Sequence, residues 1–579
     1  MILSALVEYY ETLAAQGKIA QSGWADVKVS YALEIGDNGE LKRVVNIKTE
    51  QQRGKKTVLV PQVMNLPAPV KRSSGILPNF LCDNSSYLLG IDTKGKPERS
   101  RDCFLACKEL HEKLLSQLDC PAANAILKFF SGWNPETASK HPALQEEYDE
   151  IVGGANLIFR TTSGYVQDDI LIADAWNSAY GESDEDMDGF CMVTGKKGPV
   201  EKIHPSIKNV AGAQSSGAAL VSFNAPSLCS YGKEQNFNAP TGKYAAFAYT
   251  TALNHLLADR ERVFRVGDTT IVCWAKNGSD AYQDFFSCSL METSQKYTPA
   301  DIYKMVQALC RGETIDFENT LLDSNMDFYI LGLSPNAARI SVRFFCHNTF
   351  GGFLNNILMH QQRLEIVRPS FDKFEVLPLW KLLSETVNQK SKDKAAAPNM
   401  AGETLRAILN NTPYPATLLN GVVLRIRAEK EVTRGRAAII KAYYLKQPNQ
   451  AVPKEEVLTV ALNPESKNIP YTLGRMFAVL EAIQSDANPG INSTIRDRYF
   501  NSASATPAVI FPTLLNLAQK HLKKIKNEGR KIYYNKLLTE LLSILEETYP
   551  NRLSLPEQGS FQLGYYHQAQ DRYTKKEEK

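Results

Sequence analysis

The sequence of 579 residues lacks the signatures of the common catalytic and metal-binding sites. It has no glycine-rich phosphate loop, no zinc-protease helix motif and no acidic cluster suited to two-metal phosphoryl chemistry. Its ten cysteines include no Cys-x-x-Cys pair, so we expect reduced thiols in a cytoplasm and no disulfide framework. No apolar run approaches the roughly 18 residues of a membrane span. We therefore expect no catalytic centre, no metal, no cofactor and no membrane contact.

The chain also lacks a strong excess of one charge. The formal net charge is +3, so any site for a polyanion must come from local clustering of cations. Apolar residues make up 43% and charged residues 22% of the chain, which is typical of folded globular proteins. A single core does not extend over a chain of this length, so we expect two to four domains.

The first part of the chain changes between helical and strand periods. Apolar residues at helical spacing predict a helix over 2–15, and the alternation in 27–35, 45–47 and 58–60 predicts an antiparallel meander. The proline-rich stretch 61–86 fits neither period and predicts a long ordered loop. Further patterns predict helices over 100–118, from Pro121 and over 298–310, a strand over 156–162, and hairpins at 262–274 and 328–345.

The polar stretch 389–399 (QKSKDKAAAPN) is the best candidate for a linker. Beyond it the pattern is helical, including one helix that starts at Thr506–Pro507 and is expected to end at Gly529. The predicted fold is therefore α+β: a mixed α/β region with antiparallel strands over 1–388, and a helical bundle over 400–579.

Two groups of residues have metal-ligand chemistry but an incomplete pattern. Asp184–Gly189 matches the first half of a calcium loop, but its twelfth position is Gly195, so a solvated acidic loop is expected. Cys103, Cys107 and His111 share one helix face among apolar residues, which favours core packing.

Two other sets of residues fall short of a site. Cys191 and His204 are too few for a structural zinc ion. Ser215 lies in a small-residue stretch, but a hydrolase elbow needs glycine where Ala213 stands. A hydrolase that uses Ser215, or a nuclease that uses the acids of 184–188, remains the alternative from another class.

The segment 212–247 is long, polar and rich in glycine. Glycines permit close approach of another backbone, amides and hydroxyls bond phosphate or base edges, and aromatic rings stack on unpaired bases. A structural loop whose polar groups satisfy one another explains the composition equally well. The candidate side chains are Gln214, Ser215, Ser216, Asn224, Lys233, Gln235, Asn236 and Lys243, with the rings of Phe223, Tyr231, Phe237 and Tyr244.

The loop 71–84 has the same character. An asparagine or lysine there is suited to reading a groove edge, and Phe80 to wedging beside a base step. A well-packed surface loop is again the open alternative. The candidates in this loop are Lys71, Arg72, Ser74, Asn79, Phe80 and Asn84.

Two basic runs occur in the helical region, over 425–446 and 520–536. Their helices have an apolar opposite face, so we expect the cations to face solvent and to follow a phosphate backbone. The candidates are Arg425, Arg427, Arg434, Arg436, Lys520, Lys523, Lys524, Lys526, Arg530 and Lys531.

Long blocks of the sequence resemble one known family. The stretch from Cys191–Gly195 through His204–Pro205 and Gly212–Leu257 resembles the signature of the large subunit of the type I-C CRISPR Cascade complex. Four further blocks, Arg72–Gly90, Tyr471–Gln484, Ile491–Leu522 and Gly559–Gln568, resemble the same family.

The resemblance implies a non-catalytic subunit of an RNA-guided complex. Such a subunit recognises the protospacer-adjacent motif, helps to unwind the target and hold the displaced strand, and helps to recruit a separate helicase-nuclease, while the guide RNA reads the sequence. The implied partners are guide RNA, double-stranded target DNA, the displaced strand, and the backbone, guide-processing and small subunits. The C-terminal helices resemble a small subunit, for which Met476 is the obvious internal start.

The resemblance places motif recognition second on Gln214–Asn236 and first on five residues of the other loop: Arg72, Ser74, Asn79, Phe80 and Asn84. It places displaced-strand binding on the basic helices. An assembly subunit that makes no DNA contact is the remaining alternative.

Overall fold

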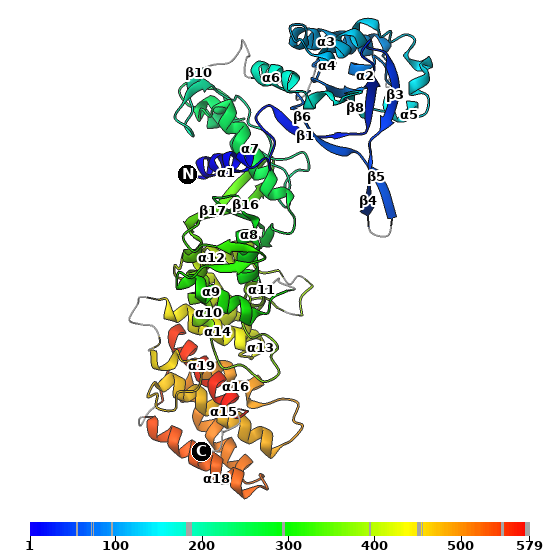
Figure 1. Ribbon diagram of the computed structural model, residues 1–579. Helices are drawn as coiled ribbons and strands as arrows, with labels where there is room; N and C mark the ends of the chain where they lie inside the picture. The colour runs from blue at the N-terminus through cyan, green and yellow to red at the C-terminus, as the bar shows by residue number, and fades with distance from the viewer. Residues whose placement is uncertain are drawn as a thin grey trace. The chain divides into compact units, whose positions relative to one another are not determined.

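The computed structural model describes residues 1–53, 56–70, 72, 75–93, 96–180, 188–291, 296–388, 390–392, 395–447, 453, 455–545 and 549–573. The chain forms two compact units. Unit 1 contains residues 1–205 and 222–252, and unit 2 contains residues 206–221 and 253–579. Strands concentrate in the N-terminal part and helices in the C-terminal part, which confirms the α+β class (Figure 1).

Most helices of unit 1 pack on a small mixed sheet. Its elements are α1 (Ile2–Ala15), β1 (Trp24–Val29), β2 (Tyr31–Ile35), β3 (Leu41–Asn46), β4 (Thr49–Arg53), β5 (Lys56–Val60), β6 (Gln62–Pro67), β7 (Cys82–Asn84), α2 (Ser85–Leu88), α3 (Pro97–Leu115), α4 (Pro121–Gly132), α5 (Tyr148–Val152), β8 (Asn156–Thr161), β9 (Gly164–Tyr165), α6 (Ile170–Ala179), β10 (Asp188–Phe190) and β11 (Lys197–Pro199), and α7 (Lys243–Ala258) continues into unit 2.

The sheet of unit 1 has the order β3-β2-β8-β7, with β9 beside β8. β2 and β8 run parallel and the other pairs run antiparallel. Alternate residues of β2 point to opposite faces. Tyr31, Leu33 and Ile35 pack with α3 and α4, whereas Ala32 joins Val29 in a second, smaller core.

The predicted meander is confirmed where β2 pairs antiparallel with β3, and wrong in the pairing of β1. The chain bends at Ser30, so β1 pairs with β6 while β2 pairs with β3 and β8. β4 and β5 form a separate hairpin that projects from the sheet (Figure 1). The predicted loop 61–86 is also only partly a loop, because it contains β6, β7 and the start of α2.

Unit 2 combines an antiparallel sheet with a helical region. Its elements are β12 (Phe264–Val266), β13 (Thr269–Ala275), α8 (Asp280–Met291), α9 (Pro299–Cys310), β14 (Ile315–Phe317), β15 (Thr320–Leu322), β16 (Asp327–Asn336), β17 (Arg339–Thr349), α10 (Phe350–Leu364), α11 (Leu379–Ser384), α12 (Pro398–Leu409), α13 (Ala416–Glu429), α14 (Arg434–Leu445), α15 (Ile469–Ala487), α16 (Ile495–Ala505), α17 (Pro507–Leu522), α18 (Glu528–Ile544) and α19 (Leu555–Asp571).

One hydrophobic core runs through unit 2. The sheet has the order β12-β13-β16-β17, and its buried face packs with α8, α9 and α10. The same core continues across residues 389–399, because α10 and α11 pack against α14. The compact units therefore divide at 205/206, 221/222 and 252/253, not at the predicted linker.

Helices α15 and α19 lie side by side at the centre of the helical region (Figure 1). Both carry a glycine where the backbones meet. A Cβ on Gly474 would lie 2.0 Å from the carbonyl oxygen of Phe561, and a Cβ on Gly564 would lie 2.1 Å from that of Tyr471. Only glycine allows this approach.

Local end signals determine most helix boundaries. Helix α9 begins directly after Thr298, as predicted, and Thr298 forms a capping box with Asp301. Helix α3 begins at Pro97, three residues before the predicted start at Ser100. Helix α17 ends at Leu522, and Gly529 lies inside α18, which Asn527 caps; the prediction that Gly529 ends the first of these helices is wrong.

Candidate nucleic-acid interface

Asp83 organises the loop that precedes β7. Its buried carboxylate accepts hydrogen bonds from both terminal nitrogens of the Arg72 guanidinium and from the backbone N–H groups of Asn79 and Asn84. The Arg72 guanidinium also lies 4.0 Å from the ring centre of Tyr87 and donates to the Leu77 carbonyl. Arg72 therefore stabilises the loop itself, which is the structural alternative left open by the sequence.

The other candidates of this loop are also engaged within unit 1. Asn79 is half-buried and its Oδ1 accepts from the Val70 N–H at 2.9 Å. Asn84 caps α2 through the Ser86 N–H. Phe80 is 1% exposed and stacks on Trp176 with ring centres 5.4 Å apart. The structure thus corrects the expectation that Phe80 is available as a wedge.

Three residues of this loop, Lys71, Ser73 and Ser74, lie outside the described residues. Three acids of the incomplete calcium loop, Asp184, Glu185 and Asp186, also lie outside them, and Asp188 begins β10.

The polar segment 212–247 belongs to both units. Its first part lies in unit 2 on the loop between Ile207 and Ala218, which pair with each other. Gly212 and Gly217 both have positive φ and enclose the tip, where Gln214, Ser215 and Ser216 are exposed. This tip presents three uncharged hydrogen-bonding side chains to solvent.

The second part of the segment lies in unit 1 and presents the ring of Tyr231 and the cation of Lys233. Tyr231 is 99% exposed and has φ +55°, a conformation that is strained for a non-glycine residue. The Asn238 amide holds the loop, because it accepts from the Ser230 N–H and donates to the carbonyls of Lys233 and Gln235. The Lys233 side chain, two residues after Tyr231 in the sequence, is also exposed.

The remaining candidates of this part are less accessible. Asn236 is 3% exposed, which corrects the expectation that it reads a ligand directly. Gln235 and Lys243 are half-buried, and Asn224 is exposed.

The turn between α17 and α18 carries an exposed group of cations. Lys520 lies on the last turn of α17, and Lys523, Lys524 and Lys526 follow within the turn. None of the four forms an ion pair with a residue in the part of the chain that the structure describes. We call these four residues the lysine turn.

The two cations that follow on α18 are already paired. Arg530 lies 3.3 Å from Asp486, and Lys531 lies 2.6 Å from Glu528. Their charges are therefore partly compensated, in contrast to those of the lysine turn.

The other basic run is mostly structural. Arg434 and Arg436, predicted to face solvent, are 9% and 2% exposed. Arg434 donates to Asp372 and to the carbonyls of Phe374 and Glu375. These acceptors come from a distant segment, so the prediction that both arginines track a phosphate backbone is wrong.

Two further arginines of this run, Arg425 and Arg436, lie close to carboxylates. Arg436 pairs with Glu429 and lies 3.4 Å from Glu385. Arg425 lies 3.7 Å from Glu429 on the same helix, and Arg427 is exposed and donates to Gln558. Arg427 is the most accessible cation of this run.

The Cys103, Cys107 and His111 side chains form core contacts. Cys103, Cys107 and His111 are buried in unit 1, where His111 accepts from the Leu81 N–H at 3.0 Å, as the core-packing interpretation predicted. All ten cysteines are free. Within the described ranges, no three His, Cys, Asp or Glu residues are grouped so as to hold a metal ion.

A cavity of about 660 Å³ in unit 2 was not predicted. Its lining comes from the stretch 369–385 and from α14, α15, α16, α18 and the end of α19. Paired tyrosines at 533–534 and 565–566 were the only signal in the sequence, and helical spacing alone explains them as core residues.

No helix among the described residues combines the length and apolar character needed to cross a bilayer. Comparison with curated proteins found no match. A family model described as CRISPR-associated protein (Cas_Csd1) matches residues 6–573, almost the entire chain. The chain therefore belongs to the Cas_Csd1 family of CRISPR-associated proteins.

Proposed function

We propose that this chain is the large subunit of a type I-C Cascade complex and that it binds DNA without cutting it. Membership of the Cas_Csd1 family supports a Cascade-type subunit. In this role the chain works with guide RNA and the other Cascade subunits, recognises the protospacer-adjacent motif, helps to unwind the target and helps to recruit a helicase-nuclease.

The lysine turn carries the DNA-binding part of the proposal. Four exposed ammonium groups within seven residues, without carboxylate partners among the described residues, form a site for successive phosphates. We assign the displaced strand to this turn, with Arg427 as a further contact.

Recognition of the flanking motif is assigned to the two exposed loops. The tip Gln214–Ser216 offers amide and hydroxyl groups of the kind that bond base edges, and Lys233 with Tyr231 offers a cation and a ring. Arg72 and Asn79 are assigned a supporting role, because their polar groups already bond within the loop.

Salt-dependent binding tests the proposal. Changing Lys520, Lys523, Lys524 and Lys526 to glutamine should weaken single-stranded DNA binding and reduce the slope of log K against log salt by about 0.7 for each phosphate that is no longer neutralised. The matched control changes four exposed lysines elsewhere in unit 2 to glutamine: Lys304, Lys390, Lys392 and Lys467.

An unchanged slope in the first variant would favour an assembly subunit without DNA contact. Incubation of the purified chain with labelled DNA and Mg²⁺ or Mn²⁺ should leave the DNA intact. Cleavage that is abolished by Ser215→Ala or Asp186→Ala would instead establish the hydrolase alternative.

A further inference from the structure

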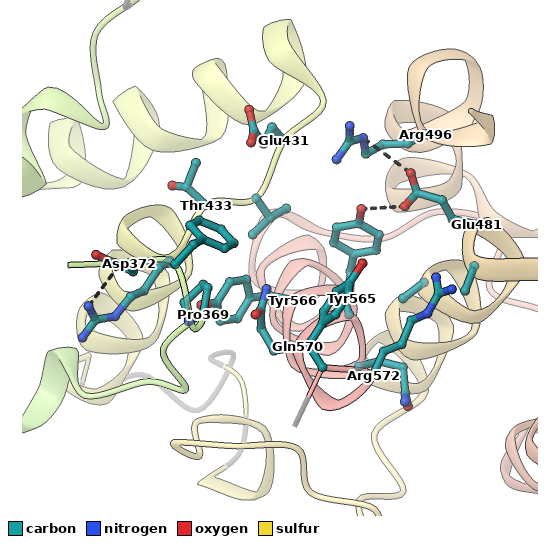
Figure 2. A pocket seen from close by; sticks show the side chains of 18 of the residues that line it. Pro369, Asp372, Glu431, Thr433, Glu481, Arg496, Tyr565, Tyr566, Gln570 and Arg572 are labelled. Carbon is teal, nitrogen blue, oxygen red and sulfur yellow. Dashed lines mark hydrogen bonds and ion pairs between the residues drawn. The ribbon is translucent and has the colours of Figure 1, made fainter. Parts of the chain in front are cut away.

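The cavity in unit 2 has an aromatic wall and an aromatic mouth. Tyr565 and Tyr566 lie on α19 and line the cavity (Figure 2). They are 6% and 2% exposed, whereas Phe371, Tyr533 and Tyr573 at the same cavity are 84%, 45% and 73% exposed. Exposed large rings gathered at a concave site are typical of a binding surface.

The inner tyrosine hydroxyls are already bonded. Tyr565 donates to Glu481 at 2.7 Å (Figure 2), and Tyr566 donates to the Val367 carbonyl at 2.7 Å. These bonds fix the two side chains, so the wall is preorganised and its rings need no rearrangement to receive a flat ligand.

The carboxylates of the lining are largely compensated. Asp372 pairs with Arg434, and Glu481 lies 3.6 Å from Arg496 (Figure 2). Lys373 is exposed and forms no ion pair within the described part of the chain. The site therefore offers the exposed ammonium group of Lys373 beside its rings.

Helix α18 connects this cavity to the lysine turn. Arg530 precedes Tyr533 by three residues, so the two lie on neighbouring positions of one helix face, about 5 Å apart along the axis. A strand whose phosphates follow Lys520–Lys526 is thus led along α18 toward the aromatic mouth.

We propose that this cavity holds an unpaired base of a single-stranded DNA segment whose phosphates lie on the lysine turn. The cavity volume lies within the range of sites for small ligands, and a base in a DNA strand combines a flat ring with a neighbouring phosphate. The proposal rests on the proposed function, because it extends displaced-strand binding to a defined base site.

The test uses the full-length chain and a 12-nucleotide oligothymidine with one 5-iodouracil, which cross-links to aromatic side chains in contact with it. Irradiation should give adducts at Phe371, Tyr533 or Tyr573, located by mass spectrometry. The double variant Phe371→Ala, Tyr533→Ala should bind the oligonucleotide about tenfold more weakly in fluorescence anisotropy. Because both side chains are substantially exposed, this variant should keep its unfolding temperature.

The conservative variant Phe371→Tyr, Tyr533→Phe retains both rings and should retain affinity and adducts. Wild-type affinity in the double alanine variant, or adducts only at other residues, would overturn the base site. If the lysine-turn variant still loses affinity in that case, the proposed function stands and the cavity serves another occupant. If neither variant loses affinity, both proposals fail.

Discussion

Three buried histidines are each paired with a tyrosine hydroxyl. The Nδ1 atoms of His204, His360 and His567 lie 2.6, 2.6 and 2.9 Å from the hydroxyls of Tyr249, Tyr414 and Tyr471, respectively. Burial lowers the pKa of His204 and His567 to about 4 and that of His360 to about 3. All three are therefore neutral at pH 7.

This neutrality predicts loss of stability in mild acid. The folded-state pKa lies below the unfolded value of about 6.5, so the unfolded chain binds more protons between these limits. The contribution of these histidines to the free energy of unfolding is fully present above pH 6.5 and is lost as the pH drops toward 4. The loss is roughly 3 kcal/mol for each histidine whose pKa falls from about 6.5 to about 4. Urea midpoints measured from pH 7.5 to 5 should show this decline.

The His360→Gln variant, which keeps a partner for Tyr414, should show a flatter decline. Exposed His255→Gln serves as its control. An equal pH dependence in wild type and His360→Gln would contradict the assignment.

Gln214 gives a second prediction at the residue scale. If its amide reads a base edge, Gln214→Ala should cost about 1–3 kcal/mol and relax preference at one flanking base pair. Binding to a library of randomised flanks would measure this change. Exposed Gln362→Ala in α10 is the control, and uniform weakening across all flanks would show that Gln214 only positions the backbone.

At the scale of elements, the contact between α15 and α19 depends on two glycines. Gly474→Ala should lower the unfolding free energy by about 3 kcal/mol or more, because the new methyl group meets backbone that cannot move aside. Gly402→Ala in α12 is the control, since its nearest neighbour would lie at an ordinary 3.6 Å. Equal urea midpoints for the two variants would mean that α15 and α19 can move apart without loss of unfolding free energy.

Elements with local signals could be predicted from the sequence. The start of the helix at Thr298 and the hairpin over 262–274 depend on residues close together in the chain, and both are confirmed. The pairing of β1 with β6 depends instead on a bend at Ser30 that leaves the alternating pattern almost unchanged. Alternation predicts a strand but does not choose its neighbour.

In the candidate site, too, features that depend on residues distant in the sequence could not be predicted. The basic composition of the lysine turn predicted its exposed cations, and all four lysines are exposed. The burial of Arg434 depends on carbonyls of Phe374 and Glu375, about 60 residues earlier in the chain. The cavity was missed for the same reason, since its wall is assembled from segments distant in sequence.

At the scale of the whole molecule, the structure bears on an internal start at Met476. This residue is buried in the middle of α15. A product that began there would lack Tyr471, which bonds His567, and Arg475, which bonds Gln568 at 3.1 Å. It would leave part of the α19 surface without its partner helix.

We therefore expect a fragment of residues 476–579 to fold poorly. A fragment of residues 455–579, which keeps all of α15, should have higher helix content by circular dichroism and elute as a compact species in size-exclusion chromatography. A 476–579 fragment with the same helix content and elution volume would restore Met476 as a sufficient start.

The division of 206–252 between the units has a consequence for synthesis on the ribosome. Unit 1 lacks residues 222–252 until the chain has grown past them, and 206–221 must wait for strands β13 and β17 of unit 2. Translation that stops at residue 205 leaves the first unit incomplete, whereas a stop after 252 supplies its entire sequence. The exposed polar tip at 214–216 thus acquires its support only after β17 has emerged.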